Sequence, residues 1–184
     1  MKNKLLAIVF LIPFYSTIFA QNIQLEWQNC FNGPKTDEAY GICSTGDGYF
    51  ITGRYEHPTN IPPGYGQSDV WLIKTDLFGN YLWDKKFGSY EDVNDCGKGV
   101  FPSADGNFYL VSGVLASEGD ISYDPYPDSE DYWVVKMDSD GNILWDKIVG
   151  GTCGDSPWAG TPTSDGGLLA VGLTCSDDGD VSQY

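Results

Sequence analysis

Basic residues are scarce in this sequence, and their scarcity excludes a group of functions. The 184 residues contain 10 Lys or Arg against 26 Asp or Glu, which gives a formal net charge of −16. Nucleic acids and anionic membrane surfaces bind proteins through Lys and Arg side chains that displace counterions. We therefore expect no nucleic-acid partner, and we interpret the acidic residues as a solvated surface.

Ligands for soft metals and nucleophilic catalysts are also few. His57 is the single histidine, and no two cysteines have the CxxC spacing. A zinc site of the Cys/His type therefore lacks ligands, and a Ser-His-Asp arrangement would depend on His57 in a proline-rich insert that reads as a surface loop. The sequence thus predicts no catalytic residue, no metal site and no cofactor.

The five cysteines are Cys30, Cys43, Cys96, Cys153 and Cys175. An odd number leaves at least one thiol free or paired outside this sequence. Most of them are predicted to be small buried side chains, and no pairing follows from their spacing.

Long hydrophobic runs are absent after residue 20. Before that point, Lys2 and Lys4 precede an interrupted apolar run that ends near Ala20. This layout is typical of a secretory signal, so residues 1–20 are predicted to be a signal peptide and 21–184 the mature chain. Its removal takes away two lysines and no acid, which changes the charge from −16 to −18. We expect an exported protein without a transmembrane segment, extracellular or on the outer cell surface, with the periplasm as the alternative.

A repeat with a period of about sixty residues organises the rest of the chain. Its copies begin at Trp27, Trp83 and Trp145, and an Asp-Gly pair follows each tryptophan after 20, 22 and 20 residues. An apolar run, the strand sequences DVWLIKTD or DYWVVKMD, and a turn then return the chain to the next tryptophan. The repeated residues are Trp27, Trp71, Asp76, Gly79, Trp83, Trp133, Asp138, Gly141 and Trp145.

Each unit reads as four short strands, and no stretch of the mature chain has helical periodicity. An all-β fold is therefore expected. Four-stranded units repeated at this length favour blades of a β-propeller, and a non-repeating β-sandwich is the alternative. The DSDGN segment reads as a turn. The acidic loops Ser117–Asp120 and Ser176–Asp180 are better candidates for calcium, but a solvated acidic loop is favoured for both.

The segments Asp76-x-x-Gly79-x-x-x-Trp83 and Asp138-x-x-Gly141-x-x-x-Trp145 resemble the docking motif of quinoprotein-type propeller repeats. Together with TSDGGLLAVG, CSDDGDVS and DYWVVKMD, they are more closely similar to the secreted β-propeller repeats of Bacteroidota-type bacteria. The resemblance implies a propeller in which the tryptophan of one blade packs against its neighbour, and export as a cargo of type IX secretion. Some members of that group are described as endoglucanase-like.

The repeat does not complete a ring in this sequence. The segment 25–31 is predicted to be the last strand of a closing blade, followed by blade one at 37–88, blade two at 93–150 and an incomplete blade three at 155–184. Two and a half blades are fewer than the four to eight of known propellers. We therefore interpret the sequence as an N-terminal fragment of a longer product.

Two inserts between second and third strands, Tyr55–Gln67 and Ser117–Glu130, supply the candidate ligand-binding residues Tyr55, Tyr65, Tyr123 and Tyr126. A tyrosine held among prolines offers a flat ring with a polar tip, and the alternative is that these rings cap the blade edges. We expect a non-enzymatic platform that binds a polysaccharide or a cell-surface protein. The alternatives are part of a secreted glycoside hydrolase, whose carboxylate pair no spacing selects, and a structural surface-layer component.

Overall fold

The computed structural model describes residues 25–58, 68–89, 94–115 and 119–181. They form ten strands in antiparallel sheets, with no helix in these four ranges. The prediction of an all-β fold is confirmed. Within the same ranges, no helix has the length and apolarity needed to cross a membrane.

Two sheets have four strands each and a third has two, and each sheet keeps its strands in chain order. The first sheet contains β1 (Glu38–Ser44), β2 (Gly48–Glu56), β3 (Ser68–Asp76) and β4 (Tyr81–Phe87). The second contains β5 (Cys96–Pro102), β6 (Phe108–Val114), β7 (Asp131–Met137) and β8 (Ile143–Val149). The third pairs β9 (Asp155–Pro162) with β10 (Leu168–Thr174).

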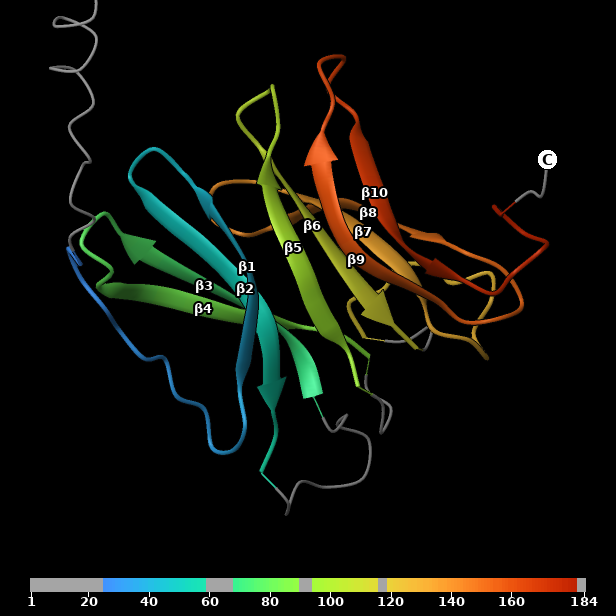
Figure 1. Cartoon of the computed structure of the whole chain (residues 1–184), viewed down its shortest axis with the longest axis horizontal. Coiled ribbons are helices and arrows are strands. Elements are labelled where there is room, and N and C mark those ends of the chain that lie inside the picture. The colour runs from blue at the N-terminus through green and yellow to red at the C-terminus, as the bar shows by residue number, and fades with distance from the viewer. Residues whose placement is uncertain (1–24, 59–67, 90–93, 116–118, 182–184) are drawn as a thin grey trace, which may run out of the picture.

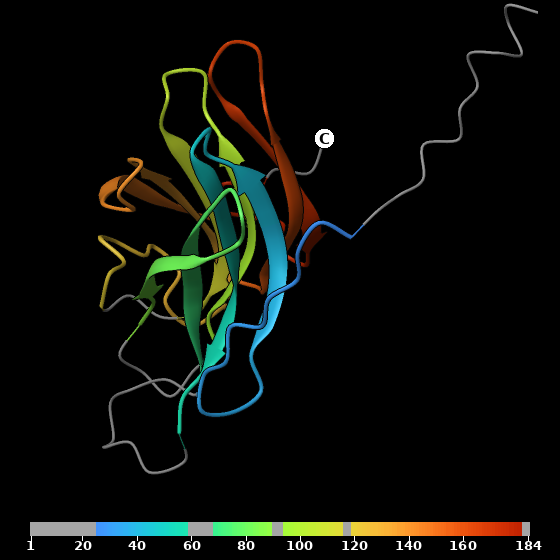
Figure 2. The same cartoon turned by 90° about the vertical axis from the view of Figure 1, so that its left-hand side faces the viewer.

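The three sheets follow one another side by side, and they do not close on themselves (Figures 1 and 2). Their first strands are neighbours, because β1 packs beside β5 and β5 packs beside β9. The hairpin turns that precede β2, β6 and β10 lie together at the upper end of Figure 1. We call the opposite end, where the odd-numbered strands begin, the loop end.

The main hydrophobic core lies between the first two sheets. Its largest members come from the second and third strands of each unit and include Phe50, Leu72, Leu110 and Trp133, all fully buried. The third strands β3 and β7 are buried along most of their length, as expected from their continuous apolar sequence.

Each third strand also carries one buried lysine. Lys74 and Lys136 are almost fully buried, and each pairs with the aspartate of its own hairpin turn, Asp47 at 2.5 Å and Asp105 at 3.1 Å. A lysine in the interior needs such a partner, because an unpaired buried charge is strongly unfavourable. The repeated Asp-Gly and Lys positions are therefore coupled across each unit.

A tryptophan of one unit covers the turn of the next. Gly141 adopts a φ of 70° in the β7–β8 turn, and a Cβ there would lie 2.8 Å from the ring of Trp83. Trp27 lies over Gly79 of the β3–β4 turn in the same manner, and the side chain of Asn29 donates to the Gly79 carbonyl at 2.7 Å. Glycine is required at both turns, because φ is positive and the ring occupies the place of a side chain.

The segment 25–31, predicted to be the last strand of a closing blade, has no strand assignment in the described residues, and its place in such a blade stays a prediction. The described residues of this segment have no strand pairing, although Trp27 occupies its repeat position over Gly79. A strand needs a neighbouring backbone to pair with. The segment is held by the contacts of the Trp27 ring with Gly79 and Tyr49 and by the hydrogen bond from Asn29 to Gly79.

The expectation that most cysteines are buried fillers is also corrected. Cys153 and Cys175 form a disulfide with their Cα atoms 5.4 Å apart, and Cys30 is exposed. Only Cys96 is a buried free thiol. The disulfide links the residues just before β9 to those just after β10, at the loop end of the third sheet.

Replacement of Trp83 by alanine tests the contact between the Trp83 ring and the turn at Gly141. We expect a loss of about 3 kcal/mol in the free energy of unfolding, at the lower end of the range for buried aromatic residues because Trp83 is half-buried. Trp145→Ala is the matched control, since Trp145 is 47 % exposed and should lose about 1 kcal/mol or less. Equal losses for the two variants, measured by urea unfolding, would contradict the joint.

Replacement of Cys175 by serine tests the disulfide. The bond closes a loop with a sequence separation of 22 residues. Its removal is expected to lower the free energy of unfolding by about 2–4 kcal/mol, because the unfolded chain gains entropy. Cys30→Ser should leave thermal unfolding unchanged, and an equally small effect of Cys175→Ser would show that the bond contributes nothing.

Candidate functional site

The loop end gathers most of the residues that could bind a ligand. Both predicted tyrosine-bearing inserts connect strands there, and the β4–β5 and β8–β9 links cross the same end. Aspartates stand at the beginning of β3, β5, β7 and β9 or immediately before it; the one at β3 is partly buried and the other three are buried. This end therefore combines variable loops with an unusual density of acidic side chains.

The structure places the predicted tyrosines in different environments. Tyr123 is 72 % exposed and free to contact a partner. Tyr55 packs edge-on against Trp71 with ring centroids 5.3 Å apart, and the amino group of Lys86 lies 4.4 Å from its ring. Tyr126 lies against Gly179 of the third unit. Tyr65 falls outside the described residues.

Packing thus accounts for two of these rings. Tyr55 packs against Trp71 and Tyr126 against Gly179, whereas Tyr123 presents its ring to solvent, and ligand binding by these tyrosines stays a prediction.

A second set of exposed side chains at the loop end comes from repeated β-bulges, which sequence reasoning missed. The register of β1 with β2 shifts between Ala39 and Gly41, and that of β5 with β6 shifts between Gly97 and Gly99. The pairing of β10 with β9 shifts opposite Trp158 in the same way. The unpaired bulge residues are Tyr40, Lys98 and Trp158, which we call the bulge row.

The bulge row is accessible. Tyr40 is 51 % exposed and Trp158 is 67 % exposed, and the amino group of Lys98 lies 5.0 Å from the Tyr40 ring. Bulges on edge strands prevent further strand pairing, and they also aim side chains beside functional sites. Edge protection explains the bulges, but it does not require two aromatic rings and a cation at the bulged positions.

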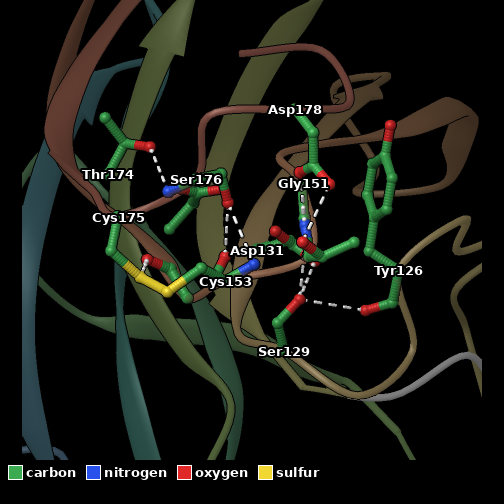
Figure 3. Close-up of a disulfide and its surroundings, with 12 residues drawn as sticks. Tyr126, Ser129, Asp131, Gly151, Cys153, Thr174, Cys175, Ser176 and Asp178 are labelled. Atoms are coloured by element: carbon green, nitrogen blue, oxygen red, sulfur yellow. Dashed lines mark hydrogen bonds between the residues drawn. A yellow bond between two sulfur atoms is a disulfide. The ribbon is translucent and has the colours of Figure 1, made fainter.

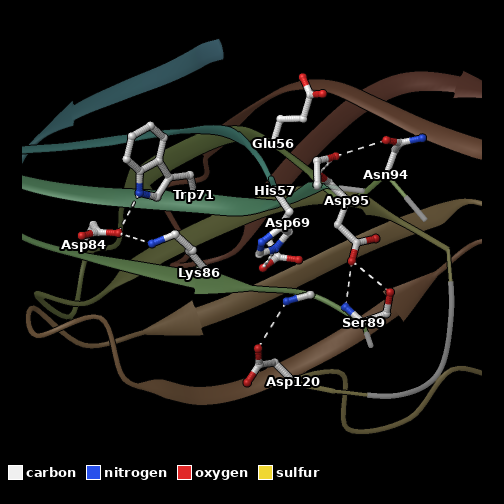
Figure 4. A network of polar contacts seen from close by, with 12 residues as sticks. Glu56, His57, Asp69, Trp71, Asp84, Lys86, Ser89, Asn94, Asp95 and Asp120 are labelled. Carbon is white, nitrogen blue, oxygen red and sulfur yellow. Dashed lines mark hydrogen bonds and ion pairs between the residues drawn. The ribbon is translucent and has the colours of Figure 1, made fainter. Parts of the chain in front are cut away.

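Beneath the row, the first and second sheets meet at a polar network that we call joint one (Figure 4). The carboxylate of Asp69 pairs with Nε2 of His57 at 2.8 Å. Oδ2 of Asp95 accepts hydrogen bonds from the backbone N–H and the hydroxyl of Ser89, at 2.8 and 3.1 Å. His57 lies just after the end of β2, in the predicted loop, and its side chain is partly buried with 16% exposed.

The second and third sheets meet at an equivalent network, joint two (Figure 3). Asp131 takes the place of Asp69, and Oδ2 of Asp131 accepts from the Ser129 hydroxyl at 3.1 Å. Asp155 takes the place of Asp95, and its Oδ2 accepts from the Ser176 hydroxyl at 2.8 Å. The backbone N–H of Asp155 donates to the Glu130 carbonyl at 2.5 Å, as that of Asp95 does to Ser68 at 3.0 Å.

Burial shifts the acidity of these carboxyls. It raises the pKa of Asp95 to about 6, against the hydrogen bonds from Ser89 and Leu115. It raises the pKa of Asp131 to about 7, and the negative charges of Asp124 and Asp155 add to the effect. Burial also opposes ionisation of Asp155, but hydrogen bonding to its carboxylate, as from the Ser176 hydroxyl to Oδ2, outweighs it and lowers the pKa of that carboxyl.

The repeated turn aspartates are fully used within their turns. Asp138 accepts from the backbone N–H groups of Asp140 and Asn142 at 2.9 and 2.8 Å, and Asp76 does the same in the first unit. Hydrogen bonds from these donors lower the pKa of both carboxyls. In the acidic loop at 176–180, Asp178 accepts from the N–H and hydroxyl of Thr152, both at 2.8 Å.

Across the residues that the structure describes, no three His, Cys, Asp or Glu side chains converge as a ready-made metal cage. Comparisons of the sequence with protein-family models and with curated proteins give no match.

The pH dependence of stability tests the buried state of Asp131. Its folded pKa of about 7 lies above the unfolded value of about 3.9. The native state therefore binds more protons, so the contribution is complete below pH 4 and is lost as the pH rises through 7. In metal-free buffer we expect the midpoint temperature of unfolding to decrease as the pH rises from about 5 to about 8.

Asp131→Asn should reduce this slope, because an amide does not titrate. Asp105→Asn is the control, since hydrogen bonds from Lys136 and Asn107 lower the pKa of that exposed carboxyl and move its titration out of the window. An unchanged slope in Asp131→Asn would show that this carboxyl ionises normally in the fold.

Proposed function

We propose that this chain is part of an exported β-propeller, and that the propeller binds a polysaccharide at its loop end. The single observation that carries the binding proposal is the bulge row, where the same backbone irregularity on neighbouring strands exposes Tyr40 and Trp158 and places the partly buried Lys98 between them. Flat rings next to a hydrogen-bond donor provide the stacking and polar contacts that sugars use.

Repetition of the joints supports the propeller part of the proposal. The contact of Trp83 with Gly141 reproduces that of Trp27 with Gly79, so successive units pack by one rule. The indole N–H of the third strand donates to an aspartate of the fourth in both units, Trp71 to Asp84 and Trp133 to Asp146, each at 2.9 Å. Units that pack by one repeated rotation are the basis of propeller architecture.

The third sheet contains two strands, β9 and β10, which correspond to the first two strands of each four-stranded unit. The outer edge of β10 is unpaired in the described residues, and a largely apolar groove of about 850 Å³ lies between it and the second sheet. The groove is lined by residues that include Tyr109, Trp145, Leu169 and Val171. A third and fourth strand of the DYWVVKMD and LWDK type would cover this surface and supply a lysine to the turn aspartate Asp165.

Export rests on the layout of residues 1–20 and on the resemblance to secreted propeller repeats. The strongly acidic composition and the disulfide between Cys153 and Cys175 agree with an extracytoplasmic compartment. A cell-surface protein is the competing partner for the same face.

A glycoside hydrolase is less well supported than a binding platform. Such an enzyme needs two carboxyl groups that reach the scissile bond from solvent. Asp95 and Asp131 have raised pKa values, as a general acid would, but both side chains are fully buried. The carboxyls with raised pKa values are thus not accessible to a substrate.

Binding to immobilised polysaccharides tests the proposal. Trp158→Ala and Tyr40→Ala are each expected to weaken retention by about tenfold or more, because stacked aromatic residues dominate such interfaces. Phe78→Ala is the matched control, since Phe78 is 75 % exposed but lies in the β3–β4 turn at the opposite end. Retention that is unaffected by both loop-end variants, or equally affected by Phe78→Ala, would refute the assignment of this face.

A further inference from the structure

Joint one and joint two repeat the same pair of aspartates, but the pair has different partners in each; Asp69 of joint one is partly buried, whereas Asp95, Asp131 and Asp155 are buried. At joint one, His57 is 2.8 Å from Asp69, and three donors from Ser89 and Leu115 point at Asp95. Neither aspartate leaves a buried oxygen without a partner. The protein itself thus supplies the imidazole and the hydrogen bonds that partner the first pair.

At joint two, three buried carboxylate oxygens have no hydrogen-bond partner: Oδ1 of Asp131, Oδ1 of Asp155 and Oδ2 of Asp124. All three side chains are more than nine-tenths buried, with exposed fractions of 0, 1 and 6 %. Among the described residues, the one ion pair at this joint is that of Lys147 with Asp180, at 3.6 Å, and it does not involve these three aspartates.

The carboxylates of Asp131 and Asp155 face a common point. A Cβ placed on Gly150 would overlap Oδ1 of Asp131 and would lie 2.9 Å from Oδ2 of Asp155. The absence of a side chain at Gly150 lets both groups approach the same stretch of backbone. Two like charges brought together in the interior are strongly unfavourable unless a cation lies with them.

The surrounding atoms are those that a hard cation prefers. The hydroxyls of Ser129 and Ser176 contact these carboxylates, and each also donates to a carbonyl, Gly151 at 2.9 Å and Cys153 at 2.7 Å (Figure 3). Both sulfurs of the joint are consumed in the Cys153–Cys175 disulfide. Only oxygen ligands are left, which excludes zinc and copper(I) as the preferred ions.

We propose that joint two binds a calcium ion through the carboxylates of Asp131 and Asp155, at the place where joint one uses His57. Hydroxyl, carbonyl and water oxygens complete the coordination, and Asp124 adds negative charge at close range. Calcium accepts six to eight oxygens in irregular geometry, whereas magnesium requires a near-ideal octahedron and keeps its water. The ion would fix the third sheet to the second and so hold β9 and its bulge residue Trp158 in the row.

Thermal unfolding of the EDTA-treated full chain at a slightly alkaline pH tests the site. An extracellular calcium module has a Kd of about 10⁻⁴–10⁻³ M, so calcium at about 10 mM should raise Tm by about 5 °C or more. Magnesium at the same concentration, and NaCl at the same ionic strength, should have little effect. Asp131→Asn should abolish the shift, and Asp69→Asn at joint one should retain it as the matched control.

Terbium luminescence gives a second readout that does not depend on stability. Terbium replaces calcium at oxygen sites, and excitation of nearby tyrosines such as Tyr132 should produce a saturable signal that calcium displaces. We expect Asp155→Asn to weaken terbium binding by at least tenfold. This measurement also applies to the unmodified chain if a variant does not fold.

Three results would overturn the proposal. The first is an EDTA-treated chain that shows neither a calcium-dependent Tm shift nor a displaceable terbium signal. The second is a calcium response that persists in both Asp131→Asn and Asp155→Asn. The third is a Tm that decreases by the same amount with and without calcium as the pH rises from about 6 to about 8. The two carboxyls would then share a proton rather than bind an ion.

Discussion

The contact between a tryptophan ring and a glycine turn in the next unit is the constraint on which this structure depends. The Trp83 ring occupies the space that a side chain at Gly141 would fill, and Trp27 relates to Gly79 in the same way. Each contact also fixes the end of a third strand against its neighbour, because the turn aspartates Asp76 and Asp138 hold the loops closed. Once this joint is set, the core residues of both sheets face one another and the loop ends are brought to the same side.

The same stacking explains why polar chemistry gathers where the units meet. Every unit begins with an aspartate that the preceding unit must cover, so each joint carries a buried acidic pair. Joint one balances its pair with His57 and joint two has no such residue among those described. The repeated packing of the units therefore places an acidic pair at each joint. Joint two lacks the histidine of joint one, and this difference is the reason for proposing a calcium ion there.

Much of the fold could be predicted from the sequence, because the repeated residues determine local structure, namely turns and buried strands. Asp-Gly pairs produced the hairpin turns, and the continuous apolar runs of β3 and β7 became buried strands. The segment 25–31 stays a prediction, because strand formation depends on a neighbouring strand and not on the segment itself. The disulfide was not predictable for a related reason, since the spacing of Cys153 and Cys175 does not show that the ends of two strands meet.

The candidate site was harder to predict than the fold. The tyrosines of the inserts were visible, but whether a ring faces solvent or caps an edge depends on packing, as Tyr55 and Tyr123 show. The bulge row left only a weak signal, which is a glycine inside each first strand, at Gly41, Gly99 and Gly160. Glycine within a strand often marks a bulge, but only the observed register identifies the residue that is displaced.

A double-mutant cycle between Trp83→Ala and Gly141→Ala measures the contact between ring and turn most directly. Gly106→Ala serves as the control, because Gly106 also has a positive φ, of 84°, but no atom within 4 Å of the added Cβ. Removal of the ring should relieve the clash of the alanine at 141, so we predict a coupling energy of about 1 kcal/mol or more, with additive effects for the control pair. Effects of Trp83→Ala and Gly141→Ala that add to within about 0.5 kcal/mol would contradict the account, since ring and turn would then be independent.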